Sequence, residues 1–139
     1  MSEEIRFTIP VCPRCKKNSQ QILINRKTGR PFVAPSSAYT AYRKAALMVI
    51  PTDARQRIDY AVNVKALYYM QTRRRVDLAN LNSALHDVLV DAGVLLDDNC
   101  SIVAGTDGSR VLYDKNRPRT EVTITKLGVD VDDTAAMQD

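Results

Sequence analysis

Three cations and three carboxylates lie near one another along the chain, and together they could bind phosphate and metal. Arg73, Arg74 and Arg75 precede Asp77, and Asp97 and Asp98 follow after one apolar-periodic segment. Carboxylate oxygens are ligands that Mg²⁺ and Mn²⁺ prefer, and Mg²⁺ usually keeps water and phosphate oxygens as its other ligands. Neighbouring arginines would hold a phosphate backbone beside such an ion. The pattern predicts phosphate chemistry assisted by a divalent metal.

Each carboxylate also has a simpler explanation. Asp77 stands directly before a helical segment, where Asp is a favoured N-cap that contributes about 1 kcal/mol. An Asp-Asp-Asn turn is a common loop and explains Asp97 and Asp98 without a metal. Two adjacent carboxylates repel each other, however, and a bound cation removes that cost. The arginines beside Asp77 favour the site, because a cap needs no cations.

A second basic segment lies near the start of the chain. Lys16, Lys17 and Asn18 follow an expected strand, and two cations with an amide in a loop are suited to phosphate contacts. Nucleophilic catalysis has little support, because His86 is the single histidine and is expected near the surface of its helix. No P-loop or dinucleotide-binding fingerprint is present.

The cysteines allow a different interpretation, a zinc-ribbon adaptor. Cys12 and Cys15 have the spacing of half a zinc site, but a structural site needs four ligands. Cys100 and His86 are the remaining candidates and lie far along the chain. We therefore expect no zinc.

Charge divides the chain into a basic and an acidic part. Residues 1–75 carry 15 Lys and Arg against 4 Asp and Glu, a balance of +11; residues 76–139 carry 5 against 12, a balance of −7. This division is typical of a protein that holds a polyanion on one surface. An uneven solvated surface would explain it as well.

The same sequence favours a cytoplasmic location. No apolar run approaches the roughly 20 residues that span a bilayer, and Ser2, Glu3 and Glu4 are unlike the basic start of a signal peptide. We expect no membrane association, and no pairing of the three cysteines in a reducing compartment.

The periodicity of apolar residues predicts one α+β domain with a small mixed sheet and two main helices. The expected elements are strands at 4–9, 58–70, 102–104 and 121–126, a hairpin within 19–35, and helices at 36–50 and 78–92. In the second helix, Leu81, Leu85 and Leu89 fall on one face, and Gly93 suits the C-cap. The domain is expected to span 1–127, followed by an acidic, disordered tail at 128–139.

Several motifs together resemble the RusA family of Holliday junction resolvases, small dimeric endonucleases of bacteria and phages. The similar segments are Lys16 to Ile22, Arg73 to Leu81, the following helix with Gly93 to Asn99, Asp107 to Arg110, and Pro118 to Ile124. They cover roughly residues 4–126. The arrangement of arginines, Asp-Leu-Ala-Asn-Leu, helix and Leu-Asp-Asp is more specific than any one motif.

The resemblance implies a Mg²⁺-dependent endodeoxyribonuclease, with Mn²⁺ as a possible substitute, that resolves four-way DNA junctions by paired symmetric nicks. It implies a homodimer acting in DNA recombination and repair. By position, Asp77 and Asp98 match catalytic carboxylates, with Asp97 beside them as a further metal ligand. Arg73–Arg75, Lys16, Lys17 and Asn18 would bind DNA.

Two positions depart from the family pattern. Many members have an aspartate where this chain has Ala79, and some have a catalytic lysine where it has Ser83. An alternative function is therefore a catalytically impaired protein that binds junctions without cutting them.

Chain geometry limits how the carboxylates can meet. A helix from Leu78 to Ala92 is about 22 Å long, whereas the steps from Gly93 to Asp98 span at most about 17 Å. Asp77 and Asp98 of one chain are therefore not expected to meet easily. An isologous dimer could bring the helix start of one subunit to the Asp97-Asp98 turn of its partner.

Overall fold

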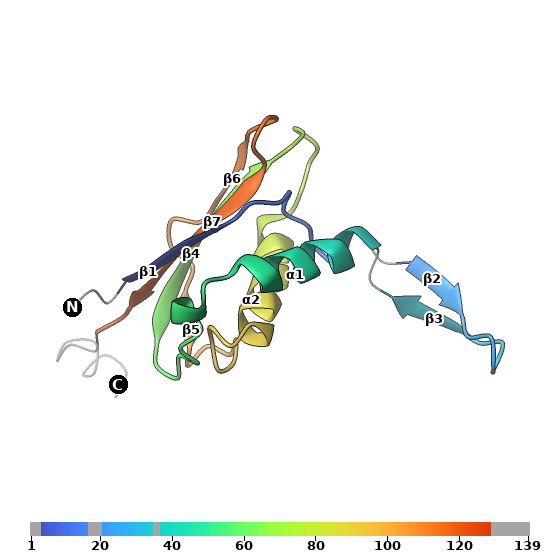
Figure 1. Cartoon of the computed structure of the whole chain (residues 1–139), viewed down its shortest axis with the longest axis horizontal. Coiled ribbons are helices and arrows are strands. Elements are labelled where there is room, and N and C mark those ends of the chain that lie inside the picture. The colour runs from blue at the N-terminus through green and yellow to red at the C-terminus, as the bar shows by residue number, and fades with distance from the viewer. Residues whose placement is uncertain (1–3, 17–20, 35–36, 129–139) are drawn as a thin grey trace, which may run out of the picture.

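The computed structural model describes residues 4–16, 21–34 and 37–128. A five-stranded mixed sheet and two helices form the main body, and a separate two-stranded hairpin projects from it (Figure 1). The elements are β1 Glu4–Ile9, β2 Gln21–Ile24, β3 Pro31–Ala34, α1 Ser37–Val49, η2 Thr52–Ala54, β4 Val62–Met70, α2 Leu78–Asp91, β5 Val103–Gly105, β6 Arg110–Tyr113 and β7 Arg119–Lys126. The α+β class predicted from the sequence is confirmed.

Strand β4 is the centre of the sheet. It runs antiparallel to β7 along nearly its whole length, and β7 pairs antiparallel with β1. On its other side β4 runs parallel to β5 near its start and to β6 near its end. The loop after β4 therefore leaves the sheet close to the end of β6.

The core lies between one face of the sheet and the two helices. Alternate residues of β4, from Val62 to Tyr68, are buried, because successive side chains of a strand point to opposite faces. Helix α2 contributes a stripe of apolar residues at helical spacing, namely Leu81, Ala84, Leu85, Val88 and Leu89. Helix α1 contributes Tyr39, Tyr42 and Ala46.

A polar contact fixes α2 against the sheet. The Tyr68 hydroxyl donates a hydrogen bond to the Asn82 side-chain oxygen at 2.6 Å. Burial raises the pKa of Tyr68, so the phenol stays protonated and remains a donor. This bond sets the start of α2 relative to the end of β4.

One expectation about secondary structure needs correction, and two elements were not expected. The strand expected at 58–70 begins only at Val62, because Ile58 forms an isolated parallel bridge with Leu95 and Arg57 has φ +49. Strand β6 and the short helix η2 were not predicted as elements. The other expected strands and helices are present with boundaries within two residues, and the expected acidic tail lies beyond the described residues apart from Gly128.

Candidate nuclease site

The arginines precede α2 in the loop that follows β4. Val76 packs partly against the core between Arg75 and Asp77, which anchors this end of the loop. The Arg73 guanidinium lies over the Tyr113 ring of β6, 4.1 Å from its centroid, and cation–π contact favours this position. The backbone N–H of Arg74 donates to the Thr72 hydroxyl at 3.4 Å. These contacts therefore hold in place the loop that carries the three arginines.

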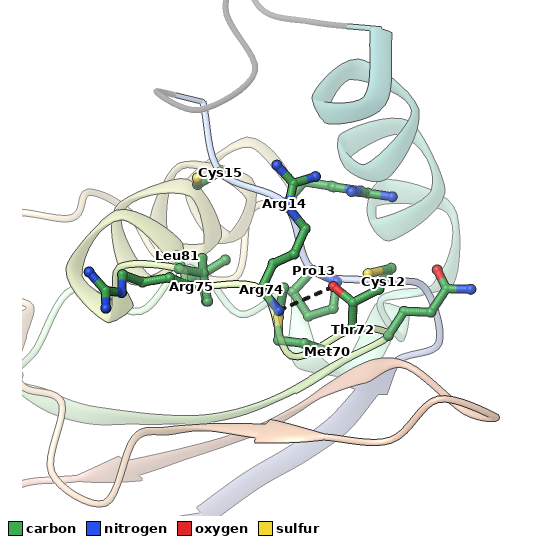
Figure 2. A pocket seen from close by; sticks show the side chains of 11 residues that line it. Cys12, Pro13, Arg14, Cys15, Met70, Thr72, Arg74, Arg75 and Leu81 are labelled. Carbon is green, nitrogen blue, oxygen red and sulfur yellow. Dashed lines mark hydrogen bonds between the residues drawn. The ribbon is translucent and has the colours of Figure 1, made fainter.

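Two hollows adjoin this loop. One of about 290 Å³ is lined by Arg74 and Arg75 and, from the segment after β1, by Cys12, Arg14 and Cys15. Figure 2 shows the three arginine side chains and both cysteines around it. The second, a more open hollow of about 520 Å³, is lined by Arg75, Val76, Asp77 and Asn80. One cation, Arg75, and one carboxylate, Asp77, therefore share the second depression, and Arg75 also lines the first.

Asp77 is the N-cap of α2, as the sequence predicted. Its backbone is extended and its carboxylate accepts a hydrogen bond from the backbone N–H of Ala79 at 2.9 Å. This is the usual role of an N-cap side chain. The same carboxylate faces the hollow with Arg75, so capping and ligand binding are compatible at this position.

Asp97 and Asp98 differ in a way the sequence did not reveal. One Asp97 oxygen accepts from the backbone N–H of Asp98 at 2.7 Å, and the other accepts from the Asn99 amide at 3.0 Å. These hydrogen bonds lower the pKa of Asp97, and the bond from the Asp98 N–H has the largest effect. The Asp98 carboxylate is exposed and interacts with the Asp97 side chain, and none of the ion pairs found among the described residues uses it. Asp97 thus stabilises the turn, and Asp98 is available to a ligand.

We expected His86 near the surface of its helix, but the structure buries part of its ring. Its Nε2 atom is buried and has no hydrogen-bond partner among the described residues. Burial lowers the pKa of His86, while the negative charges of Asp98 and Asp87 oppose that shift. A neutral imidazole therefore lies within the electrostatic field of Asp98. Periodicity alone could not find this, because the Asp98 turn comes from a later segment.

Lys16 makes a contact within the molecule. Its ammonium pairs with the Asp87 carboxylate of α2 and lies 5.7 Å from the centroid of the Tyr39 ring. The hydrogen bond to Asp87 raises the pKa of Lys16, so it is charged at neutral pH. Its side chain remains 42% exposed and can still meet a phosphate. The other predicted members of this loop, Lys17 and Asn18, lie outside the described residues.

The structure does not bring the predicted carboxylates into one cluster within the chain. Among residues 4–16, 21–34 and 37–128, no group of three or more His, Cys, Asp or Glu is placed to hold a metal ion. Asp77 begins α2, which is about 21 Å long, and Asp98 follows its other end. The chemistry of both carboxylates suits Mg²⁺, which can bind through one or two protein carboxylates with water and phosphate completing its shell.

Comparison with known families agrees with this arrangement. The family model described as endodeoxyribonuclease RusA matches residues 4–125, nearly the whole described chain. The chain belongs to the RusA family. The match includes the arginine loop, the capped start of α2 and the Asp97-Asp98 turn, so the RusA-like motifs seen in the sequence are confirmed as a family relationship. No curated protein matches the chain.

No helix within the part of the chain that the structure describes has the length and apolar character needed to cross a bilayer. For this RusA-family chain, the described surface instead offers the basic loop and the neighbouring carboxylate. Membership of an endodeoxyribonuclease family makes DNA the substrate class of this chain.

Proposed function

We propose that this protein is a metal-dependent, structure-specific endodeoxyribonuclease that resolves four-way DNA junctions by paired symmetric nicks. The observation that carries the proposal is the hollow shared by Arg75, Asp77 and Asn80 in a chain of the RusA endodeoxyribonuclease family. A cation beside a carboxylate allows a phosphate and a metal ion to be bound together. The activity would serve DNA recombination and repair in the cytoplasm of a bacterial or phage-infected cell.

DNA positioning falls to the basic loops. Arg74 and Arg75 are exposed beside the proposed metal ligand, and Arg73 is oriented by the Tyr113 ring. Lys16, Lys17 and Asn18 would extend the same contact from the segment after β1. Guanidinium groups suit this task because they bind phosphate oxygens through two parallel hydrogen bonds.

Asp77 and Asp98 are the proposed catalytic carboxylates and metal ligands, with Asp97 a third, weaker candidate. Both Asp97 oxygens already accept hydrogen bonds, which favours Asp98 as the principal ligand of the pair. The ion is expected to be Mg²⁺, replaceable by Mn²⁺, and when bound it supplies an activated water and offsets the developing charge on the phosphate. Asp77 is held in orientation by its cap bond, so little ordering is required on binding.

The site is proposed to form across a homodimer. Within one chain the described residues gather no three-ligand metal cluster, and α2 separates the two carboxylates. A two-fold axis would place Asp77 of one subunit against Asp98 of the other, and would generate two equivalent sites. Two sites match the two symmetric nicks that a four-way junction requires.

Ala79 supports a second candidate function, junction binding without cleavage. It is exposed in the first turn of α2, two residues after Asp77, where many RusA-like chains have an aspartate. A methyl group cannot bind a metal. Loss of one ligand would weaken the binding of the metal ion more than it weakens the contacts of the arginines with DNA.

A nicking assay separates the two functions. End-labelled four-way junction is incubated with the purified protein and Mg²⁺, with Mn²⁺, or with a chelator, and a linear duplex of the same sequence is the control. Paired nicks at symmetric positions that need the metal and the junction are expected. Tight junction binding without nicks in either metal would establish the binding-only function, and equal cutting of the linear duplex would refute structure specificity.

A further inference from the structure

The β2–β3 hairpin stands apart from the rest of the fold. Gln21–Ile24 and Pro31–Ala34 pair antiparallel as a sheet of two strands, separate from the five-stranded sheet. Figure 1 shows the hairpin projecting beyond the start of α1, with its turn farthest from the main body. An isolated two-stranded ribbon gains little stability alone. Its projection therefore calls for an explanation beyond support of the core.

The hairpin is strongly basic. Its turn carries Arg26, Lys27 and Arg30, all exposed, and residues 21–34 contain no Asp or Glu. Indeed, no acidic residue occurs anywhere between Glu4 and Asp53. None of the ion pairs found among the described residues uses these three cations. Their charge is uncompensated within the described part of the chain.

The turn is held in one shape by local hydrogen bonds. The Asn25 side-chain oxygen accepts from the backbone N–H of Lys27 at 2.8 Å and of Thr28 at 3.2 Å. The Asn25 carbonyl accepts from Gly29 at 2.7 Å, and Gly29 adopts φ +71, which glycine tolerates without strain. Because the turn is already ordered, it loses little conformational entropy when its cations bind a partner.

We propose that this hairpin is a second DNA-binding element that contacts the phosphate backbone of a duplex arm away from the proposed cleavage site. A two-stranded ribbon fits the major groove of B-DNA, which is about 12 Å wide. Arg26, Lys27 and Arg30 would bind phosphates, and the exposed side chains of Ile24 and Phe32 would meet the groove's apolar groups. The inference rests on the proposed function, since it assumes a DNA substrate.

A second copy of the chain is the competing occupant, because Leu23, Ile24 and Phe32 are exposed apolar residues. Charge favours DNA. Two such hairpins would each bring three cations without a carboxylate, and their repulsion would oppose association. The phosphate backbone has the complementary charge.

The test compares two double variants that remove the same charges. The tip variant is Arg26→Ala with Lys27→Ala, and its control is Arg110→Ala with Lys44→Ala, an exposed pair on β6 and α1. Junction binding is measured by fluorescence anisotropy over a series of salt concentrations. Each neutralised phosphate contributes a slope of about 0.9 in log affinity against log salt, so the loss of two contacts should reduce the slope by about 1.8.

At roughly 0.1 M salt the same relation predicts a loss of about tenfold to sixtyfold in affinity for the tip variant and a smaller loss for the control. Hydroxyl-radical footprints should lose protection on the arms and keep it at the crossover. Equal losses in the two variants, or an unchanged footprint, would overturn the proposal. So would a tip variant that binds DNA normally but changes oligomeric state in sedimentation. If the unaltered protein neither binds nor nicks junctions, the proposed function itself fails, which is a different result from any of these.

Discussion

Asp77 has two roles in our interpretation, a helix cap and a metal ligand, and substitutions can separate them. Asn is as good an N-cap as Asp, whereas Ala removes the acceptor for the Ala79 N–H. We predict that Asp77→Asn abolishes nicking with little loss of stability, and that Asp77→Ala abolishes nicking and also destabilises the fold.

The magnitudes follow from the cap. Its loss in Asp77→Ala should cost about 1 kcal/mol, which lowers the melting temperature by about 3 °C for a chain of this size. Asp77→Asn keeps the hydrogen bond and loses only the interaction of the carboxylate with the helix dipole, about 0.3–1 kcal/mol. Its melting temperature should therefore fall by less than that of the Ala variant.

The assay combines thermal unfolding with nicking of a labelled four-way junction in Mg²⁺. Asp59→Asn is the control, because Asp59 is an exposed carboxylate outside α2 and outside the proposed ligand set. Nicking by Asp77→Asn at the unaltered rate would remove Asp77 from the site. An Ala variant as stable as the unaltered protein would show that the cap bond contributes nothing measurable.

Three further predictions concern the remaining site residues. Asp98→Asn should abolish nicking with junction binding kept or tightened, and mixing it with Asp77→Asn subunits should restore part of the activity if the site is shared; no recovery after verified subunit exchange would place each site within one chain. Ala79→Asp should raise the nicking rate if a missing ligand limits the enzyme, and an unchanged rate would show that the site is complete without it. Because burial lowers the folded pKa of His86 below its unfolded value near 6.5, the unfolded state binds the proton more readily and stability should fall from pH 7.5 to 5.5. His86→Gln should flatten the dependence of the melting temperature on pH over this range, measured against the unaltered protein in the same buffers. An equal pH dependence in both proteins would refute the assignment to His86.

Much of the fold could be predicted from local pattern. Alternating residues identified β1, and apolar residues at helical spacing with Asp77 before them identified α2. β6 was missed because its exposed and half-buried residues show no clear alternation, and because its pairing with β4 depends on distant residues. The strand at 58–70 was drawn too long because Ile58 continues the apolar alternation while it bridges to Leu95 instead.

The residues of the candidate site could be proposed from the sequence, whereas their arrangement could not. Charge and spacing selected Asp77 and the arginines, because the relevant residues are adjacent in the sequence. The different environments of Asp97 and Asp98 depend on hydrogen bonds within the turn, which spacing does not reveal. His86 and Lys16 depend on contacts between segments far apart in the chain.

The pairing of β1 with β7 has a consequence for how the protein is made. Glu4 pairs with Thr125, so the first strand waits for its partner until almost all of the described chain has been synthesised. Contacts this distant in sequence slow folding, because a long loop must close before they form. Meanwhile β4, which also pairs with β7 along its length, leaves the ribosome without its main neighbour. We therefore expect the nascent chain to gain a nuclease surface late, near the end of translation, and to depend on protection of its exposed strands until then.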